Sequence, residues 1–168
     1  MSISINDEIM EEINQKTQMC FQCNTCTSGC PVFHVFPDFK PANIARQLFL
    51  QKSVPMYKGQ PAFWLCSSCL TCEQKCPQDV DIAHIFYKLK EWSVKNNVEV
   101  PEGIVKEAEM METGITVQVS QSITNRRQEL GLPDLPKANL DEVSKILKHS
   151  GFKERLDNLI VIKEGNTD

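Results

Sequence analysis

The chain has 168 residues, 41% apolar side chains and a net charge of −4, so it can form one or two small domains with a modest core. The acidic balance argues against nucleic-acid binding, for which a basic surface is expected. We find no apolar run long enough to span a bilayer and no secretory signal, and we therefore expect a soluble cytoplasmic protein.

The N-terminal region predicts a helix over residues 4–19. Ile5, Ile9 and Ile13 recur at four-residue intervals, and the acidic residues near the start suit a helix N-terminus. The end of this helix would deliver Cys20, the first of eight cysteines.

The middle of the chain predicts further helices. Pro41 suits the first position of a helix over 41–51, and PAFWLC indicates a short helix after a turn at residues 55–61. Asp79 or Asp81 is expected to cap an amphipathic helix over 81–95.

The C-terminal region, residues 96–168, has no cysteine. We expect it to dock a partner or to brace the core. Its predicted elements are helices at 101–112, 121–130 and 140–149, a strand or extended arm at 115–120, a proline-rich break at 132–139 and a frayed end at 164–168.

The eight cysteines lie in two runs with the same spacing, C-x2-C-x2-C-x3-C-P, and this is the ligand spacing of a bacterial-type iron–sulfur site. Two-residue gaps can direct three thiolates at one cluster, and the proline carries the chain away. The sequence therefore predicts two [4Fe–4S] clusters. The runs are Cys20, Cys23, Cys26 and Cys30, followed by Pro31, and Cys66, Cys69, Cys72 and Cys76, followed by Pro77.

In two-cluster proteins the fourth cysteine of each run binds the other cluster, which holds the two clusters close together. We expect the same crossing here. The predicted ligands are Cys20, Cys23, Cys26 and Cys76 for cluster 1, and Cys66, Cys69, Cys72 and Cys30 for cluster 2.

Two other uses of the cysteines fit the pattern less well than two clusters do. Zinc takes four thiolates but usually from separated C-x2–4-C pairs, which fits runs of four poorly. Disulfides suit small secreted domains, and this chain begins without a secretory signal.

The fold that we expect is mainly α: an α-helical ferredoxin core with pseudo-two-fold symmetry and a helical or extended C-terminal tail. The 35 residues between Cys30 and Cys66 look helical, unlike the short strands of small two-cluster ferredoxins. The expected divisions are an N-terminal helix at 1–19, the cluster domain at 20–95 and the tail at 96–168. Aromatic residues are expected to shield the clusters or to pack in the core: Phe21, Phe33, Phe36, Phe63, Trp64 and Phe86.

A catalytic site is not expected in this chain. We find no Rossmann glycine pattern, no phosphate-binding loop and no pairing of a nucleophile with a base. His34 and His84 follow the two motifs, but eight cysteines already supply eight ligands.

The segments FQCNTCTSGCP and WLCSSCLTCEQKCPQDVDI resemble those of the C subunit of methanogen-type heterodisulfide reductase, over roughly residues 15–95. The resemblance implies an electron-transfer subunit without catalysis of its own. Electrons would pass from the flavin-containing A subunit to the catalytic B subunit, which reduces the coenzyme M–coenzyme B disulfide in methanogenesis.

The resemblance also implies that a hydrogenase or a formate dehydrogenase supplies the larger complex. Two alternatives stay open. The chain could serve another heterodisulfide-reductase-like, quinone-linked or thiol-linked reductase, or it could be a free two-cluster carrier.

Overall fold

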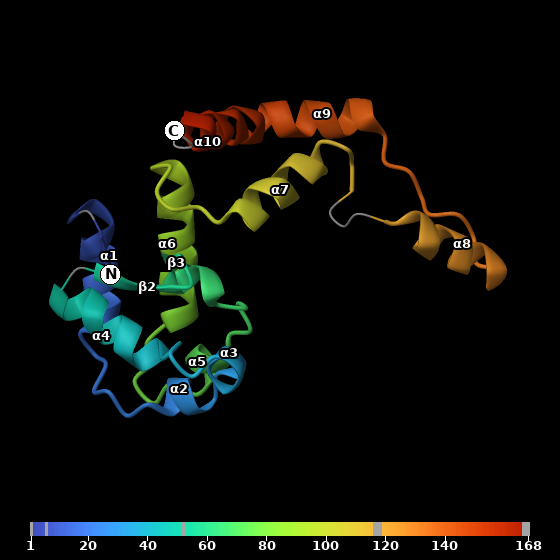
Figure 1. The fold of residues 1–168 in the computed structure, drawn as a ribbon. Coiled ribbons are helices and arrows are strands. Elements are labelled where there is room, and N and C mark those ends of the chain that lie inside the picture. Colours follow the sequence, from blue (N-terminus) through green and yellow to red (C-terminus); the bar gives the residue numbers. More distant parts are fainter. Residues whose placement is uncertain (1, 6, 52, 116–118, 166–168) are drawn as a thin grey trace. The chain divides into compact units, whose positions relative to one another are not determined.

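The structure is a computed structural model that describes residues 2–5, 7–51, 53–115 and 119–165. The chain forms two compact units, one within residues 1–99 and the other within 100–168 (Figure 1). Among the described residues, no helix has the length and apolar character that crossing a membrane requires.

The first unit holds both cysteine motifs and is built mainly from helices, as the sequence predicts. Its elements are β1 (Ser2–Ser4), α1 (Asp7–Thr17), α2 (Thr25–Ser28), α3 (Pro31–Val35), α4 (Pro41–Gln51), β2 (Ser53–Tyr57), β3 (Gln60–Pro61), the 3₁₀ helix η1 (Ala62–Leu65), α5 (Thr71–Gln74) and α6 (Ile82–Lys95).

A small antiparallel sheet in the order β1-β2-β3 corrects two sequence predictions. Residues 2–4 pair with 53–55, so the first helix begins at Asp7 rather than at residue 4. The predicted turn at 55–61 is instead a hairpin, closed by Lys58 and Gly59, both with positive φ. Prolines at both ends of this segment hid the strands, because proline is disfavoured inside a sheet.

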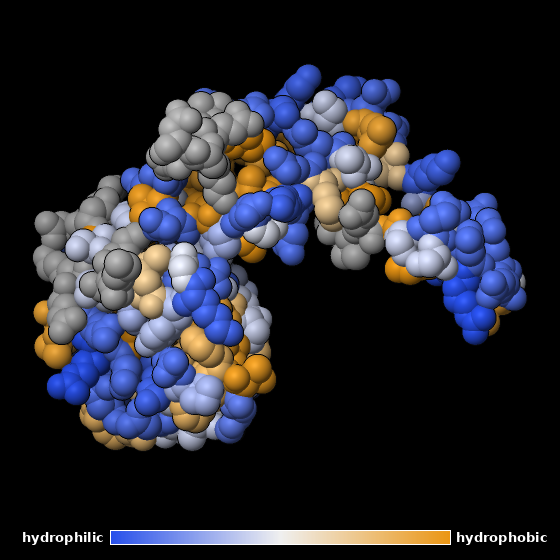
Figure 2. All heavy atoms as spheres, viewed as in Figure 1, coloured by the Kyte–Doolittle hydropathy of each residue, from blue (hydrophilic) through white to orange (hydrophobic). Residues whose placement is uncertain are grey.

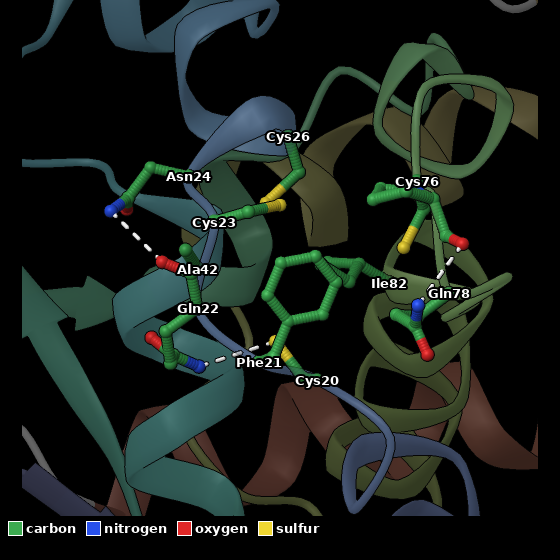
Figure 3. A pocket seen from close by; sticks show the side chains of 11 residues that line it. Cys20, Phe21, Gln22, Cys23, Asn24, Cys26, Ala42, Cys76, Gln78 and Ile82 are labelled. Atoms are coloured by element: carbon green, nitrogen blue, oxygen red, sulfur yellow. Dashed lines mark hydrogen bonds between the residues drawn. The ribbon is translucent and has the colours of Figure 1, made fainter.

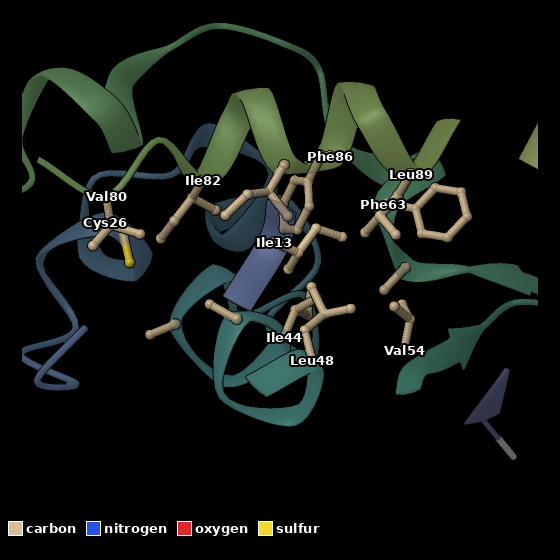
Figure 4. Packing of buried hydrophobic residues seen from close by; sticks show 14 of the residues in the cluster. Ile13, Cys26, Ile44, Leu48, Val54, Phe63, Val80, Ile82, Phe86 and Leu89 are labelled. Atoms are coloured by element: carbon tan, nitrogen blue, oxygen red, sulfur yellow. The ribbon is translucent and has the colours of Figure 1, made fainter. Parts of the chain in front are cut away.

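The core of the first unit lies where α1 packs against α4 and α6. Figure 4 shows the apolar side chains that these helices and the hairpin region contribute to it. Because α1 shares this core, it belongs to the same packed body as the helices that flank the motifs. Buried members include Met10, Ile13, Ile44, Leu48, Val54, Phe63, Ile82, Phe86 and Leu89.

Helix α4 offers a direct test of this packing. Leu48 is fully buried, whereas Leu50 on the same helix is 61% exposed. Leu48→Ala should destabilise the protein by about 2–5 kcal/mol through lost burial and a cavity. Leu50→Ala should stay within about 0.5 kcal/mol. Anaerobic thermal unfolding of both variants measures this difference, and equal melting temperatures would contradict the described core.

The start of α6 differs from the expected aspartate cap. Asp81 occupies the N-cap position, but its side chain makes no capping hydrogen bond and instead forms an ion pair with Lys16 of α1. Glu73 of α5 replaces it: its Oε1 accepts a hydrogen bond from the backbone N–H of His84 at 2.8 Å. The carboxylate also suits the positive end of the helix dipole.

The second unit contains α7 (Glu102–Met111), α8 (Gln121–Glu129), α9 (Leu140–His149) and α10 (Phe152–Gly165). The first three follow the predicted helices closely, and α10 was not predicted. Residues 116–118 of the expected arm, and 166–168 of the expected frayed end, lie outside the described residues.

Helix α10 organises this unit. It packs against α7 and α9, and Lys153 joins it to Glu112 through an ion pair of 2.5 Å. Leu147, Leu156 and Leu159 are buried. The sequence did not reveal α10 because the glycine after α9 indicates a helix end, whereas the helical pattern resumes directly beyond it.

Helix α8 has no buried residue. Figure 2 shows mainly hydrophilic side chains over it, with separate apolar residues between them. Ser120 caps its N-terminus through a 3.4 Å hydrogen bond from the backbone N–H of Ile123. The helix is therefore specified by local signals rather than by packing.

Candidate cluster-binding site

The two cysteine motifs fold alike, with equivalent residues 46 positions apart, as from Cys20 to Cys66. In each motif, residues at alternate positions adopt the left-handed conformation, and a one-turn helix follows: α2 in the first motif and α5 in the second. The four left-handed residues are Gln22, Asn24, Ser68 and Leu70, with φ between 58° and 62°.

This backbone is suited to an anionic group. Left-handed residues between right-handed or extended ones turn backbone N–H groups into a concave nest, a conformation found at many iron–sulfur sites. Leu70 is the least expected of the four, because a bulky side chain is disfavoured at positive φ. Its strained conformation indicates that the surrounding fold imposes it.

The first pocket gathers cysteines from both motifs around the ring of Phe21 (Figure 3). It encloses about 310 Å³, counting space open to solvent. The lining side chains carry no formal charge besides any on the thiols. They are Cys20, Phe21, Gln22, Cys23, Asn24, Cys26, Ala42, Cys76, Pro77, Gln78 and Ile82.

The second pocket is the counterpart of the first and encloses the same volume, about 310 Å³. Three of its cysteines come from the second motif and one from the first. It is more apolar than the first pocket, because no amide side chain lines it. The lining residues are Cys30, Val32, Phe39, Pro41, Cys66, Ser67, Cys69, Leu70, Cys72, Ala83 and Phe86.

Short helices direct the fourth cysteine of each motif into the opposite pocket. Helix α2 carries Cys26, which lines the first pocket, and leads to Cys30, which lines the second. Helix α5 carries Cys72, which lines the second pocket, and leads to Cys76, which lines the first. The two helices pack against each other. Gly29, at the end of α2, lies directly against the Lys75 side chain, whose Cδ would be 3.0 Å from a Cβ atom at this position.

Each motif also fixes the helix that follows it. Thr27 Oγ1 accepts a hydrogen bond from the backbone N–H of Ala42 at 3.2 Å, in the first turn of α4. Glu73, the equivalent residue of the second motif, does the same for α6. Cluster motifs and core helices are thereby linked, because each cap joins a cysteine-bearing turn to a packed helix.

Hydrogen bonds reach the sulfur atoms in both pockets. In the first, Gln22 Nε2 donates to Cys20 Sγ at 3.2 Å, and the Val80 N–H donates to Cys76 Sγ at 3.2 Å. In the second, the Ser68 N–H donates to Cys66 Sγ at 3.4 Å. Such bonds stabilise thiolate ligands and tune the clusters that they hold.

In each motif, the threonine that precedes the third cysteine forms a hydrogen bond with the sulfur of the second cysteine. Cys23 Sγ lies 3.3 Å from Thr25 Oγ1, and Cys69 Sγ lies 3.4 Å from Thr71 Oγ1. These hydrogen bonds lower the pKa of both exposed thiols. The threonine hydroxyl is the donor once the cysteine is a thiolate, which has no proton to give.

Burial has the opposite effect on the inner thiols. It raises the pKa of Cys26 to about 11 and that of Cys72 to about 12, and it raises the pKa of Cys66. A neutral, buried thiol is favoured until a cation neutralises the thiolate. Metal binding supplies that cation, because a coordinating thiol is deprotonated outright.

The residues present fit two iron–sulfur clusters. Each pocket offers four sulfur donors, and soft thiolates select metals such as those of iron–sulfur clusters. The left-handed turns and the N–H donors to sulfur suit an anionic group, and the surrounding residues are largely apolar. No histidine lines either pocket: His34 Nε2 contacts the Ser28 carbonyl at 3.1 Å, and His84 faces Glu12 at 4.0 Å.

The aromatic residues divide between the two roles expected of them. Phe21 lines the first pocket and Phe86 the second. Phe63 is fully buried in the core, away from both lining sets. Phe33, Phe36 and Trp64 are half-buried and pack against the core. Two of the six aromatic residues therefore line a cluster pocket, and the other four belong to the core or its edge.

Several site residues were not identified from the sequence. The two threonines had a visible signal, because both motifs read C-x-T-C at the equivalent position. Gln22 and Thr27 had none, since their roles depend on left-handed backbone and on a helix 15 residues away.

Comparison with known proteins gives the class of this site. Residues 16–80 match the family described as a 4Fe-4S dicluster domain. The match spans both motifs, and the eight cysteines correspond to two [4Fe–4S] clusters. The chain therefore contains a 4Fe-4S dicluster domain.

Over most of its length the chain is also similar to C subunits of heterodisulfide reductases, which confirms the resemblance found in the sequence. It is 27% identical to the C subunit of the H(2):CoB-CoM heterodisulfide,ferredoxin reductase of Methanothermobacter thermautotrophicus, over 90% of this chain and 86% of that protein. It is 28% identical to the C subunit of the Ferredoxin:CoB-CoM heterodisulfide reductase of Methanosarcina mazei, over 80% and 86%.

A third relative, from Archaeoglobus profundus, is named as a protein like the C subunit of heterodisulfide reductase. It is 24% identical over 88% of this chain and 80% of that protein. These alignments reach well beyond residues 15–95. The tail, which added little to the resemblance seen in the sequence, therefore shares in the similarity.

Proposed function

We propose that the chain relays electrons from a flavin-containing subunit to the catalytic subunit that reduces the coenzyme M–coenzyme B heterodisulfide. The observation that carries this proposal is the exchange of cysteines between two adjacent pockets. Two clusters held in this way form a path for single electrons. The names of the relatives, which specify this heterodisulfide and a C subunit, support the assignment to the reductase.

The proposal gives this chain no chemical step at the disulfide. The clusters supply one-electron chemistry when bound, and the protein's own residues hold them, donate hydrogen bonds to their ligands and limit water. The flavin-containing A subunit, the catalytic B subunit, a hydrogenase or formate dehydrogenase upstream and a cytoplasmic location all belong to the proposal.

The ligand sets are part of the same proposal. Cluster 1 is bound by Cys20, Cys23, Cys26 and Cys76, and cluster 2 by Cys30, Cys66, Cys69 and Cys72. Support comes from the two pockets, each lined by one of these sets.

The crossing predicts which cluster each fourth cysteine serves. Cys76→Ala should damage the cluster built on Cys20, Cys23 and Cys26, although Cys76 lies in the other motif. Cys30→Ala is the matched variant and should damage the opposite cluster. Electron paramagnetic resonance (EPR) of anaerobically reduced samples shows which cluster each variant affects. A Cys23→Ser variant assigns the signals independently, because it changes the signal of the first cluster.

Uncrossed ligation gives the reverse pattern. If Cys76→Ala altered the same signal as Cys69→Ser, and Cys30→Ala the same signal as Cys23→Ser, each motif would bind its own cluster. The assignment above would then be wrong.

Reconstitution tests the relay itself. The isolated chain should accept electrons from dithionite and reduce no heterodisulfide. Adding the catalytic subunit should produce disulfide reduction that depends on this chain. Substantial reduction by the isolated chain would require a catalytic site within it, and a catalytic subunit that worked equally well without the chain would make the relay unnecessary.

A further inference from the structure

The two motifs have the same backbone conformation, but they differ in the charged side chain that contacts the second motif. Lys90 of α6 places its Nζ 3.0 Å from the backbone oxygen of Cys66, to which it donates a hydrogen bond. Cys66 is equivalent to Cys20, whose sulfur receives its hydrogen bond from the neutral amide of Gln22. The two motifs therefore differ at their first cysteine: a positively charged side chain contacts Cys66, whereas a neutral one contacts Cys20.

The position of Lys90 is fixed by its surroundings. Its Nζ lies 5.8 Å from the ring centroid of Trp64 and 5.9 Å from that of Tyr87, within the range of cation–π attraction. The residue is half-buried and forms no ion pair among the described residues. Its charge is thus held next to the motif without a carboxylate to neutralise it.

Two other charged side chains near the motifs, unlike Lys90, have a partner that offsets their charge. Lys16, close to the start of the first motif, is paired with Asp81. Glu73 follows Cys72, but its carboxylate accepts a hydrogen bond at the N-terminus of α6, where the helix dipole opposes its charge. Lys75 lies within the second motif, but its side chain runs beside Gly29 of the first, so its charge borders both motifs. Lys90 differs from these residues because its ammonium group donates directly to a cluster-binding cysteine of the second motif and has no carboxylate partner among the described residues.

We propose that Lys90 tunes the second cluster: its charge raises the reduction potential of the cluster held by Cys30, Cys66, Cys69 and Cys72 and leaves that of the first cluster nearly unchanged. This inference rests on the proposed ligand sets. Reduction adds one electron, here from dithionite as the one-electron donor, and no bond or proton need move. A fixed cation stabilises the added negative charge, most strongly where water is partly excluded.

The test uses anaerobically purified, cluster-loaded protein and three variants. Lys90→Gln removes the charge but keeps an N–H donor of similar length, and Lys90→Arg keeps the charge. Lys88→Gln removes a charge from the same helix at a residue that pairs with Glu12, 3.6 Å away, instead of contacting the motif. Dithionite titrations followed by EPR give the two midpoint potentials, and Cys23→Ser identifies the signal of the first cluster.

Lys90→Gln should shift the potential of the second cluster downward and leave the first in place. Lys90→Arg should restore most of the wild-type value, and Lys88→Gln should move neither. The proposal is overturned if Lys90→Gln shifts no potential, shifts both equally or acts as Lys88→Gln does.

Iron analysis separates this failure from a failure of the proposed function. Eight irons and two EPR signals in the wild type, with no shift in Lys90→Gln, would overturn the role of Lys90 alone. A wild type without two clusters would overturn the relay, and the role of Lys90 with it.

Discussion

Replacing either Cys23 or Cys69 with alanine should reduce disulfide turnover by the assembled complex to the level measured without this chain. The two residues are the exposed cysteines of the first and the second pocket. Each is the middle ligand of its C-x2-C-x2-C run, so its loss removes a corner of one proposed cluster. In a path with two clusters in series, losing either one interrupts the flow of electrons.

The control must separate lost electron transfer from lost assembly. Gln74→Ala changes an exposed residue of α5, in the same motif as Cys69, that lines neither pocket. It should retain full turnover. Co-purification should show that the cysteine variants still bind their partners. An assembled complex that lacked one cluster and kept wild-type turnover would show that the clusters do not act in series.

Removing the clusters should unfold the first unit. The ligands of each proposed cluster come from both motifs, whose equivalent cysteines lie 46 residues apart in sequence. Helices α2 and α5, which each carry one of these cysteines, also cap the core helices. Because a metal site that joins distant segments contributes its binding energy to folding, cluster loss should release α4 and α6 from their packing.

Circular dichroism before and after iron chelation under oxidising conditions measures this loss. The helical signal of the first unit should fall substantially, and the cooperative melting transition of the cluster-loaded protein should disappear. Chelator under reducing, anaerobic conditions is the control and should have a much smaller effect. An unchanged spectrum and an unchanged melting temperature after complete cluster loss would show that the helices alone support the fold.

The features that the sequence predicted best are those with a strong local signal. Pro41 starts α4, and the apolar stripe of α6 defines a helix whose observed bounds, 82–95, differ by one residue from the prediction. The cysteine spacing predicted two clusters, because it is repeated without a stray cysteine. Short-range pattern and ligand spacing were sufficient in these places.

What the sequence did not reveal depends on contacts between distant segments. Strand β1 forms because it pairs with β2, about 50 residues later, and Glu73 caps α6 only because α5 packs beside it. The hairpin turn uses Lys58 and Gly59 rather than the Asn-Gly or Asp-Gly pairs that signal such turns most clearly. The role of Lys90 is equally invisible, since a lysine on an amphipathic helix usually faces solvent.

Reoxidation of the two clusters in a single turnover tests the relay most directly. The chain, assembled with the catalytic subunit, is reduced with dithionite, freed of excess reductant and mixed with the heterodisulfide, and both cluster signals are followed by EPR. We predict that both clusters are reoxidised in the complex and that neither is reoxidised in the isolated chain. Clusters that stayed reduced in a catalytically active complex, or that the heterodisulfide oxidised without the partner, would contradict the relay.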